Sequence, residues 1–272
     1  MPNMPLQQHA RPRPPALEGR ATERAALPSS VRVEQVVQVF EQGGPPVLDR
    51  IDLDVGPGEF VCLLGASGCG KSTLLSLMAG LSAPTSGSIE VTVGRPALMF
   101  QEPALMPWLT AAGNVELALR ARGAGRRERR NEAERLLTVV NLAGQGGKRV
   151  HELSGGMCQR VALARALAQD SRLLLMDEPF ASLDAITRDA LHEELARLWS
   201  EQGLAIVFVT HNVREAVRLG QRVLLMSSRP GRIVREWQIE LSQPRVIESP
   251  GVGALATEIT GHLRAEIIRH AR

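Results

Sequence analysis

The residues from 65 to 72 read Gly-Ala-Ser-Gly-Cys-Gly-Lys-Ser, which is the pattern G-x-x-x-x-G-K-[ST] of a phosphate-binding loop. An apolar run of strand length, 60–64, precedes the octet, and a run with helical periodicity, 72–79, follows it. The glycines let several backbone N–H groups converge at the N-terminus of the new helix, and this arrangement favours a phosphate there. Lys71 is one of only two lysines among 32 basic residues, and its flexible ammonium suits such a loop better than a guanidinium. The octet therefore predicts a strand, a phosphate-binding turn and a helix.

The composition is that of a globular protein. With 272 residues, a hydrophobic share of 44% and a charged share of 22%, the chain can form one large or two modest domains. The net charge of +3 is too small to indicate a nucleic-acid partner. No stretch reaches the roughly 18 apolar residues of a membrane span, and the proline-rich N-terminus lacks the apolar core of a signal peptide. We therefore expect a protein that stays on the cytoplasmic side.

The cysteines argue against a disulfide framework and against a zinc site. There are three of them, and none has a Cys or His neighbour at metal-ligand spacing. Cys69 lies inside the octet, beside Lys71 and a helix N-terminus. Because positive charge stabilises a thiolate, the sequence predicts a lowered pKa for this thiol and slower alkylation when ATP is bound.

The order of elements predicts a layered α/β fold. Two β-rich runs ahead of the octet, 31–40 and 47–55, predict antiparallel strands. Two continuous apolar runs, 173–176 and 205–209, are typical of parallel strands that are covered on both faces. Helices are expected at 110–121, 127–141, 154–169, 185–202, 212–219 and 252–270, and a further strand at 232–241.

Two carboxylates directly follow the apolar run 173–176. Asp177 and Glu178 are thus expected at the carboxyl edge of a sheet, where ligands bind in open α/β folds. Asp177 is placed to hold Mg²⁺, and Glu178 to orient and deprotonate an attacking water. An acidic loop after a core strand is the alternative interpretation, and the phosphate-binding octet favours the chemical one.

A second glycine-rich helix start makes the pattern specific. Ser154, Gly155 and Gly156, within Leu-Ser-Gly-Gly-Met, precede a predicted helix and form another anion-binding N-terminus. With this segment, the octet and Asp177, the chain resembles the nucleotide-binding subunits of ABC transporters. The resemblance implies a P-loop NTPase fold with a RecA-like core, an N-terminal antiparallel β-subdomain and a helical signature subdomain. It also implies an ATPase domain at 30–245 with its helical subdomain at about 102–170. The Pro/Arg/Ala bias of residues 1–29 predicts a disordered tail, and the amphipathic pattern near the end predicts a helical extension at 246–272.

The resemblance assigns roles to individual residues. It implies a homodimer in which two ATP molecules lie between the subunits, with Mg²⁺ as the metal. Glu178 and His211 are then the catalytic residues, and Ser72, Gln101 and Asp177 the metal-binding ones. ATP is expected to contact Phe40, Gly65, Ala66, Ser67, Gly68, Cys69, Gly70, Lys71, Ser72 and Thr73 of one subunit, and Ser154, Gly155, Gly156 and Asp184 of the partner subunit.

Adenine stacking is the least certain of these roles on sequence grounds, because the chain has no tyrosine. Phe40 occupies the position of the family's stacking aromatic, where a ring face contributes about 1 kcal/mol. It also ends an apolar run, so burial in the core is the alternative. A lone histidine such as His211 is more often structural, but the ordered set of motifs favours catalysis.

The segment that follows Gln101 resembles the importer branch that serves aliphatic sulfonates, taurine and nitrate. In that branch it docks on the membrane permease, so Trp108 and Met106 are candidate docking residues, with internal packing as the alternative for Met106. The implied partners are two transmembrane permease subunits and an extracytoplasmic solute-binding protein, and the implied location is peripheral, on the cytoplasmic side of the cell membrane. Aliphatic sulfonates are favoured as the solute. A non-transport ABC ATPase of DNA repair or translation, and a module that binds ATP without hydrolysing it, are the rival functions.

Overall fold

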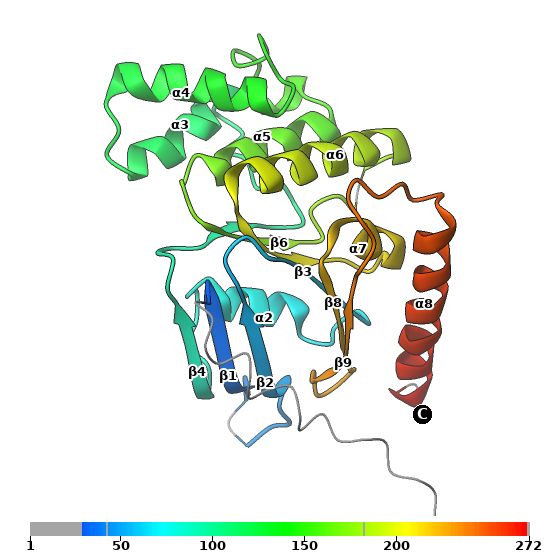
Figure 1. Ribbon diagram of the computed structural model, residues 1–272. Coiled ribbons are helices and arrows are strands. Elements are labelled where there is room, and N and C mark those ends of the chain that lie inside the picture. The colour runs from blue at the N-terminus through cyan, green and yellow to red at the C-terminus, as the bar shows by residue number, and fades with distance from the viewer. Residues whose placement is uncertain (1–28, 42, 182, 271–272) are drawn as a thin grey trace, which may run out of the picture.

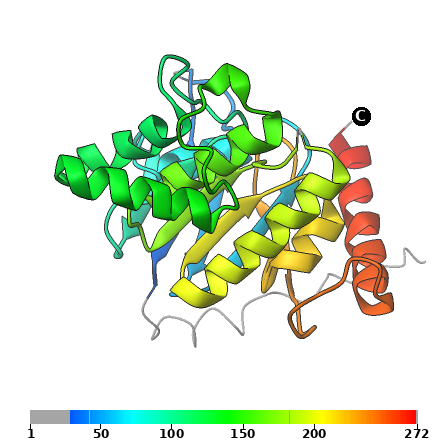
Figure 2. The same cartoon turned by 90° about the horizontal axis from the view of Figure 1, so that it is seen from above.

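The computed structural model describes residues 29–41, 43–181 and 183–270 as a layered α/β arrangement (Figure 1). The tail expected at 1–29 therefore lies, apart from Ser29, outside the described residues. A six-stranded sheet forms the centre. Helices cover one of its faces, and a three-stranded sheet together with one helix covers the other (Figures 1 and 2). The predicted layered α/β fold is confirmed.

The six-stranded sheet has the order β5-β6-β7-β3-β8-β9. Its neighbouring strands are parallel except at the edge, where β9 runs antiparallel to β8. The strands are β3 (Phe60–Gly65), β5 (Ala97–Met99), β6 (Leu173–Asp177), β7 (Ala205–Val209), β8 (Arg222–Met226) and β9 (Ile233–Gln238).

Both faces of this sheet are buried, which explains the continuous apolar runs in the sequence. In β7, Ile206 and Phe208 point into the core on the helical side, whereas Val207 and Val209 point into the core on the opposite side. Strand β3 alternates in the same way. A strand that is covered on both faces has no solvent side, so its sequence shows no polar alternation.

The smaller sheet has the order β2-β1-β4 and is antiparallel throughout its described pairs. Its strands are β1 (Val31–Gln38), β2 (Leu48–Val55) and β4 (Ser86–Val91). Val31 pairs with Val55, and Gln38 with Leu48. The predicted antiparallel pairing of the two strands ahead of the octet is thus confirmed.

The helices divide between the two faces of the central sheet. The apolar side chains of α2 pack with the smaller sheet, whereas those of α3 to α8 belong to the core on the other face. The elements are α2 (Lys71–Met78), α3 (Ala111–Ala121), α4 (Arg126–Val139), the 3-10 turn η1 (Val150–Glu152), α5 (Gly155–Leu167), α6 (Ala185–Gln202), α7 (Val213–Leu219) and α8 (Pro250–His270).

Strand β8 is an element that the sequence prediction omitted. Its last four residues, 223–226, are apolar and buried, but its first residue is Arg222, which is only 3% exposed. Arg222 is tolerated there because it forms ion pairs with Glu59 and Glu236. A charged residue at a buried strand position obscured the apolar run.

A helix that crosses a bilayer must be both long and apolar. Among the described residues, no helix is both long enough and apolar enough to traverse a bilayer.

Candidate functional site

The order of the strands brings the predicted site residues to one edge of the central sheet. Strands β5, β6, β7 and β3 are parallel neighbours, so their carboxyl ends lie side by side. Gln101 follows β5, Asp177 ends β6, and His211 follows β7. The octet follows β3 and leads into α2. Four motifs that are far apart in the sequence thus meet at one edge.

The Lys71 side chain lies inside the loop formed by the octet. Its ammonium donates hydrogen bonds to the carbonyl oxygens of Gly65, at 3.0 Å, and Ala66, at 2.9 Å. Lys71 is 6% exposed, so its charge is held close to the loop backbone. In the described residues it forms no ion pair with a carboxylate, which leaves its positive charge for an anion at the loop.

Two glycines of the octet occupy positions that a side chain could not. Gly70 has a φ of 102°, and a Cβ there would lie 2.6 Å from Leu48 Cδ2. A Cβ on Gly65 would lie 2.7 Å from the Cys69 sulfur and 3.1 Å from a carbonyl oxygen of β8. The backbone therefore takes its tight course because neither residue has a side chain.

The expectation for Cys69 is wrong. Cys69 is 1% exposed, with its sulfur 3.8 Å from the Lys71 ammonium. Burial raises the pKa of the Cys69 thiol, and the opposing effect of the Lys71 charge does not cancel it. The sequence showed the nearby charge but not the depth of burial. We now expect slow alkylation of Cys69 with or without nucleotide.

Ser72 and Asp177 connect the loop to the end of β6. The Ser72 side chain lies beside the Asp177 carboxyl and favours its ionised form. Burial raises the pKa of Asp177 and the Glu178 carboxylate raises it further, whereas the Ser72 side chain and the Lys71 charge oppose that rise. A hydroxyl and a carboxylate that lie close together beside a phosphate-binding loop are the oxygen ligands that Mg²⁺ prefers.

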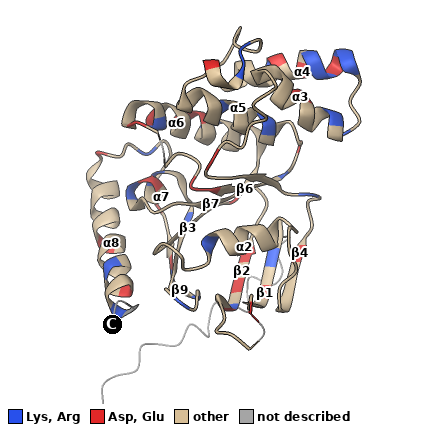
Figure 3. Ribbon diagram, turned by 180° about the vertical axis from the view of Figure 1, so that it is seen from behind, with Lys and Arg blue, Asp and Glu red and all other residues tan. Residues whose placement is uncertain are grey.

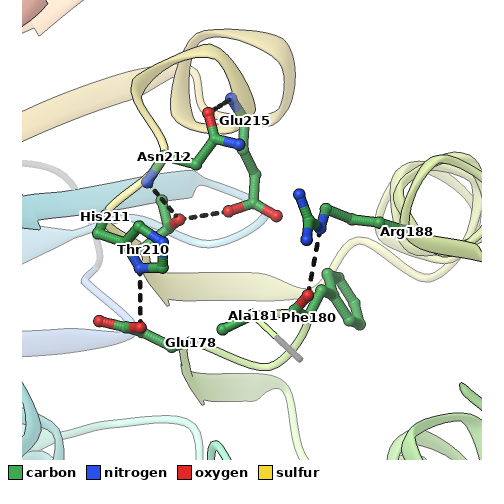
Figure 4. Close-up of a pocket in the computed structure, with 8 residues that line it drawn as sticks. All are labelled: Glu178, Phe180, Ala181, Arg188, Thr210, His211, Asn212 and Glu215. Carbon is green, nitrogen blue, oxygen red and sulfur yellow. Dashed lines mark hydrogen bonds and ion pairs between the residues drawn. The ribbon is translucent and has the colours of Figure 1, made fainter. Parts of the chain in front are cut away.

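Glu178 and His211 face each other across a small pocket (Figure 4). Glu178 Oε2 lies 2.9 Å from His211 Nδ1. Glu178 has a φ of 42°, an uncommon conformation for a residue with a side chain, and such strain is concentrated at functional sites. Its backbone N–H donates to the carbonyl oxygen of Val209, at 3.0 Å, which fixes the end of β6 against that of β7. The geometry brings together the two residues that the sequence predicts as catalytic.

Gln101 lies in an exposed segment just after β5. Its carbonyl oxygen accepts a hydrogen bond of 2.9 Å from the side chain of Gln159, a residue of α5 that is 1% exposed. The backbone of this segment is thus tied to the helix that begins at the Leu-Ser-Gly-Gly sequence, while the Gln101 side chain lies on the surface.

The residues expected to act from the partner subunit are at two helix starts. Ser154 caps α5 by accepting a hydrogen bond from Met157 N, and Asp184 caps α6 by accepting one from Thr187 N. Hydrogen bonds from the backbone and the side chain of Thr187 lower the pKa of the Asp184 carboxyl. Both caps are exposed. Ser182, two positions before Asp184, lies outside the described residues.

Within the described residues, no hydrogen bond or ion pair joins Ser154, Gly155, Gly156 or Asp184 to the octet of the same chain. This separation is compatible with action in a second subunit.

Phe40 is not a core residue. Strand β1 ends at Gln38, and the Phe40 side chain is 68% exposed. The alternative interpretation of this residue, burial at the end of an apolar strand, is therefore wrong. A largely exposed aromatic ring on the smaller sheet's side of the loop is free to stack on a flat ligand.

Sequence reasoning missed the residues that support Glu178 and His211 from behind. Thr210, Glu215 and Arg188 also line the pocket in Figure 4, and the buried His192 lies behind it on α6. Asn212 caps α7 through its side chain, and Thr-His-Asn before a helix was a legible capping signal. Nothing in the sequence pairs His192 with Glu215, because they are 23 residues apart on different helices.

Sequence comparison places these motifs in a known family. The profile of the ABC transporter family matches residues 48–181. The taurine import ATP-binding protein of Burkholderia thailandensis is 46% identical over 216 residues, which cover 76% of this chain and 83% of that protein. The aliphatic sulfonates import ATP-binding protein of Pseudomonas fluorescens is 45% identical over 244 residues, which cover 90% of each chain. Its counterpart in Streptomyces avermitilis is 43% identical over 256 residues, covering 94% of this chain and 95% of that protein.

Structural comparison agrees with the sequence. A dimeric ATP-binding cassette in a post-hydrolysis state, bound to ADP and Pi, superposes with a TM-score of 0.70 at 32% identity. The superposition covers 78% of this chain and all of that one. The fold, the octet, the Leu-Ser-Gly-Gly helix start and the level of identity to curated relatives all lead to the same assignment. The chain belongs to the ABC transporter family, as one of its ATP-binding proteins.

Proposed function

We propose that this chain is the ATP-hydrolysing subunit of an ABC importer, with aliphatic sulfonates as the most suitable solute. The observation that carries the proposal is the meeting of three pairs at one sheet edge: Lys71 with its loop, Ser72 with Asp177, and Glu178 with His211. A phosphate-binding loop alone indicates only binding. A carboxylate and an imidazole at the same edge add the groups that hydrolysis needs.

Nucleotide binding is assigned to the octet and to Phe40. The N–H groups in the first turn of α2 are available to the phosphates, and Lys71 can turn from the carbonyl oxygens of Gly65 and Ala66 to the phosphate oxygens. Phe40 would stack on adenine. Because Gly65 and Gly70 have no side chains, the loop backbone can come close enough to the phosphates for these contacts.

The residues fit a magnesium ion that arrives with ATP. The Ser72 hydroxyl and the Asp177 carboxylate, which are near neighbours, would hold it, and the Gln101 side chain would complete the set from the exposed segment after β5. The raised pKa of the Asp177 carboxyl fits this role, because a buried carboxylate with no cation beside it is costly. The ion supplies positive charge to the phosphates.

For hydrolysis, Glu178 accepts a proton from the attacking water and orients it. His211 holds the Glu178 carboxylate through Nδ1, at 2.9 Å, and presents the other side of its ring toward the nucleotide. Lys71 stabilises the negative charge that develops on the phosphates. Removal of a positioned general base typically costs 10²- to 10⁴-fold in rate, on the order of the effect expected here.

The exposed caps of α5 and α6 support a two-subunit site. Ser154 and Gly155 at the start of α5 present N–H groups to solvent, and Asp184 is exposed at the start of α6. In a two-fold dimer these groups would reach the ATP held by the partner subunit. The dimeric cassette to which this chain is similar is compatible with that arrangement.

Coupling to a permease is assigned to the segment after Gln101. The Trp108 side chain is 69% exposed, and a large exposed aromatic ring marks an interaction surface. Met106 is only half exposed, and its backbone is hydrogen-bonded to the Asn114 side chain at 2.7 Å, so it contributes less surface. We propose two permease subunits and an extracytoplasmic binding protein as partners, and a peripheral position on the cytoplasmic side.

Glu178→Gln tests the hydrolytic assignment. We expect the purified variant to bind ATP with wild-type affinity, to form a dimer that persists in ATP, and to hydrolyse at least 100-fold more slowly, by the general-base argument above. Gel filtration with ATP and a phosphate-release assay measure the two effects. Wild-type turnover in this variant would overturn the role of Glu178.

The solute is tested by growth. A strain that lacks this gene is grown with one alkanesulfonate, taurine or nitrate as the sole source of sulfur or nitrogen, with sulfate and ammonium as controls. Failure on alkanesulfonates alone, restored by the wild-type gene and not by the Glu178→Gln variant, is the expected result. Normal growth on every sulfonate would exclude the favoured solute, and failure on taurine or nitrate would identify the alternative.

A further inference from the structure

At the wall of the pocket, Thr210 and Glu215 form a buried polar network with His192, which is not itself a lining residue. His192 on α6 is 1% exposed and Glu215 on α7 is 5% exposed. His192 Nε2 lies 2.5 Å from Glu215 Oε1, and the other carboxylate oxygen of Glu215 accepts a hydrogen bond from the Thr210 hydroxyl. A carboxylate at this depth is stable only if its oxygens are paired. The position of Glu215 therefore depends on both donors.

Thr210 links this network to the turn that carries His211. The Thr210 oxygen accepts a hydrogen bond of 2.9 Å from Asn212 N, so it bridges the two neighbours of His211. Because the hydroxyl has one hydrogen, its donation to Glu215 determines which way the oxygen faces. If the Glu215 side chain moved, the turn formed by residues 210–212 would therefore be held less firmly.

His211 has little else to hold it. Its side chain is 64% exposed. In the part of the chain that the structure describes, its ring has one hydrogen-bond partner, the Glu178 carboxylate. The direction of the ring is therefore set by the backbone of residues 210–212 more than by contacts of the ring itself.

Helix α6, which carries His192, also contacts the segment that carries Glu178. The His192 ring packs against the Phe180 ring, with centroids 5.6 Å apart. One turn earlier on α6, Arg188 donates hydrogen bonds to the carbonyl oxygens of Phe180, at 3.2 Å, and Leu183, at 2.6 Å. Helix α6 thus supports both sides of the pocket in Figure 4.

We propose that His192 is a positioning residue for ATP hydrolysis, an inference that rests on the proposed function. It acts through Glu215 and Thr210, which fix the turn of His211, and the packing of its ring against Phe180 holds the His192 side chain in place. Its active group is the Nε2–H. The other ring nitrogen, Nδ1, is buried without a hydrogen-bond partner among the described residues, and the nearest carboxylate oxygen, of Asp189, is 3.9 Å away.

The first test compares two substitutions at position 192. His192→Leu removes the donor, and we expect kcat for ATP hydrolysis to fall about tenfold with KM within about twofold, because a small misplacement of a catalytic group slows the chemistry without touching the phosphate-binding loop. His192→Gln keeps an N–H donor at similar reach and is expected to restore most of kcat. Equal activity of the Leu variant and the wild type would overturn the proposal.

A double-mutant cycle separates positioning from general loosening. If His192 acts through His211, then His192→Leu has no further effect on kcat in a His211→Ala background. Multiplicative losses in the double variant would overturn the proposal. Leu198→Ala is the matched control, because it removes a side chain that is 1% exposed from the same helix. It is expected to lower the melting temperature and to leave kcat within about twofold, as an unrelated packing change does.

A spectroscopic measurement keeps the inference testable apart from activity. In ¹H–¹³C NMR spectra of the full chain, His192→Leu is expected to shift or broaden the ring signal of His211, while the signal of the exposed His151 stays in place. An unchanged His211 signal would overturn the inference. A wild-type protein without ATP hydrolysis would overturn the proposed function, and the NMR result would still decide on the positioning of His211.

Discussion

Asp177 is a buried carboxyl that the free protein accommodates at a cost. Burial raises its pKa, and the Glu178 carboxylate adds to the rise. A folded-state pKa above the unfolded value means that the folded protein holds this proton more tightly. Stability from this residue is therefore present at low pH and falls as the pH rises from about 3.8 through the raised pKa. At neutral pH the ionised carboxylate opposes folding until a cation is bound.

Asp177→Asn is expected to raise the melting temperature of the nucleotide-free protein at pH 7, because the amide removes that cost while keeping the shape. The gain should disappear near pH 3, where the wild-type carboxyl is protonated in both states. If Asp177 holds Mg²⁺ as proposed, hydrolysis should fall at least 100-fold in the same variant. Calorimetry across pH and a phosphate-release assay measure these effects. The control Asp170→Asn changes an exposed acid on the helical side, and a matching gain there would contradict the argument.

Phe40 is the residue for which the structure most clearly separates two readings of the sequence. Its ring is 68% exposed in the free chain. Phe40→Ala is expected to raise KM for ATP about fivefold, as the loss of about 1 kcal/mol of stacking implies, and to leave the melting temperature nearly unchanged. The exposed Leu81, replaced by alanine, is the matched control. Unchanged ATP affinity in the Phe40 variant would refute stacking.

At the scale of single residues, the sequence predicted the local structure correctly where neighbouring residues determine it. The octet fixes a strand, a turn and a helix within a few residues, and Lys71 lies inside the loop as its neighbours require. Cys69 shows the limit, because its burial depends on β8, more than 150 positions later, and that burial raises rather than lowers the thiol pKa. His192 shows it too, since its partner Glu215 belongs to another helix.

At the scale of elements, the start of α5 packs tightly against α6. A Cβ on Gly156 would lie 2.6 Å from Thr187 Cγ2, whereas a Cβ on the preceding Gly155 would meet nothing within 4 Å. The two glycines of the Leu-Ser-Gly-Gly sequence therefore have different reasons to be glycine. Gly156 allows α5 and α6 to approach each other closely, whereas the space beside Gly155 at the start of α5 is open.

This difference gives a paired prediction. Gly155→Ala should stabilise the chain by about 0.5–1 kcal/mol through helix propensity, whereas Gly156→Ala should destabilise it because Thr187 must move. Adding Thr187→Ser, which removes the clashing methyl group, should recover most of the loss. Urea denaturation of the four proteins measures these changes in the free energy of unfolding. Equal stability of the two alanine variants would contradict the packing argument.

Prediction of elements was good where the hydrophobic period was unbroken. Strand β7 was predicted with the bounds that the structure shows, Ala205–Val209, because every residue in it is buried. Strand β8 was omitted because it begins with Arg222, and the small third strand β4 (Ser86–Val91) joins its sheet with mostly exposed residues. The pairing of β4 with β1 joins residues 49 to 60 positions apart, which periodicity does not encode.

At the scale of the whole molecule, Arg222 ties the two sheets together. Its side chain is 4% exposed and pairs with Glu59 at 3.0 Å and Glu236 at 2.9 Å. It also donates a hydrogen bond of 2.7 Å to the carbonyl oxygen of Asp54, at the end of the smaller sheet. One guanidinium thus joins β8, β9, the start of β3 and β2.

Arg222→Met is expected to lower the free energy of unfolding by about 1–3 kcal/mol, because it removes the buried cation that pairs with two partly exposed carboxylates, those of Glu59 and Glu236. Chemical denaturation measures the loss. Arg50→Met is the control: Arg50 is an exposed arginine of the smaller sheet with a single ion pair, and its replacement should change stability by less than about 0.5 kcal/mol. Comparable losses in the free energy of unfolding would show that the Arg222 network contributes no more to stability than an exposed ion pair does. Figure 3 shows charged residues both on the helices and on the strands of the smaller sheet, with Lys and Arg frequent on α4.

The strand order also decides when the site can exist during synthesis. Strand β7 (Ala205–Val209) lies between β3 and β6, although both of those emerge from the ribosome before it. With strands about 4.8 Å apart, a chain released after Asp177 would have a gap of one strand between the octet and that carboxylate. The octet and Asp177 can therefore take up their positions in the completed sheet only after residue 209 has left the exit tunnel and β7 has entered the sheet.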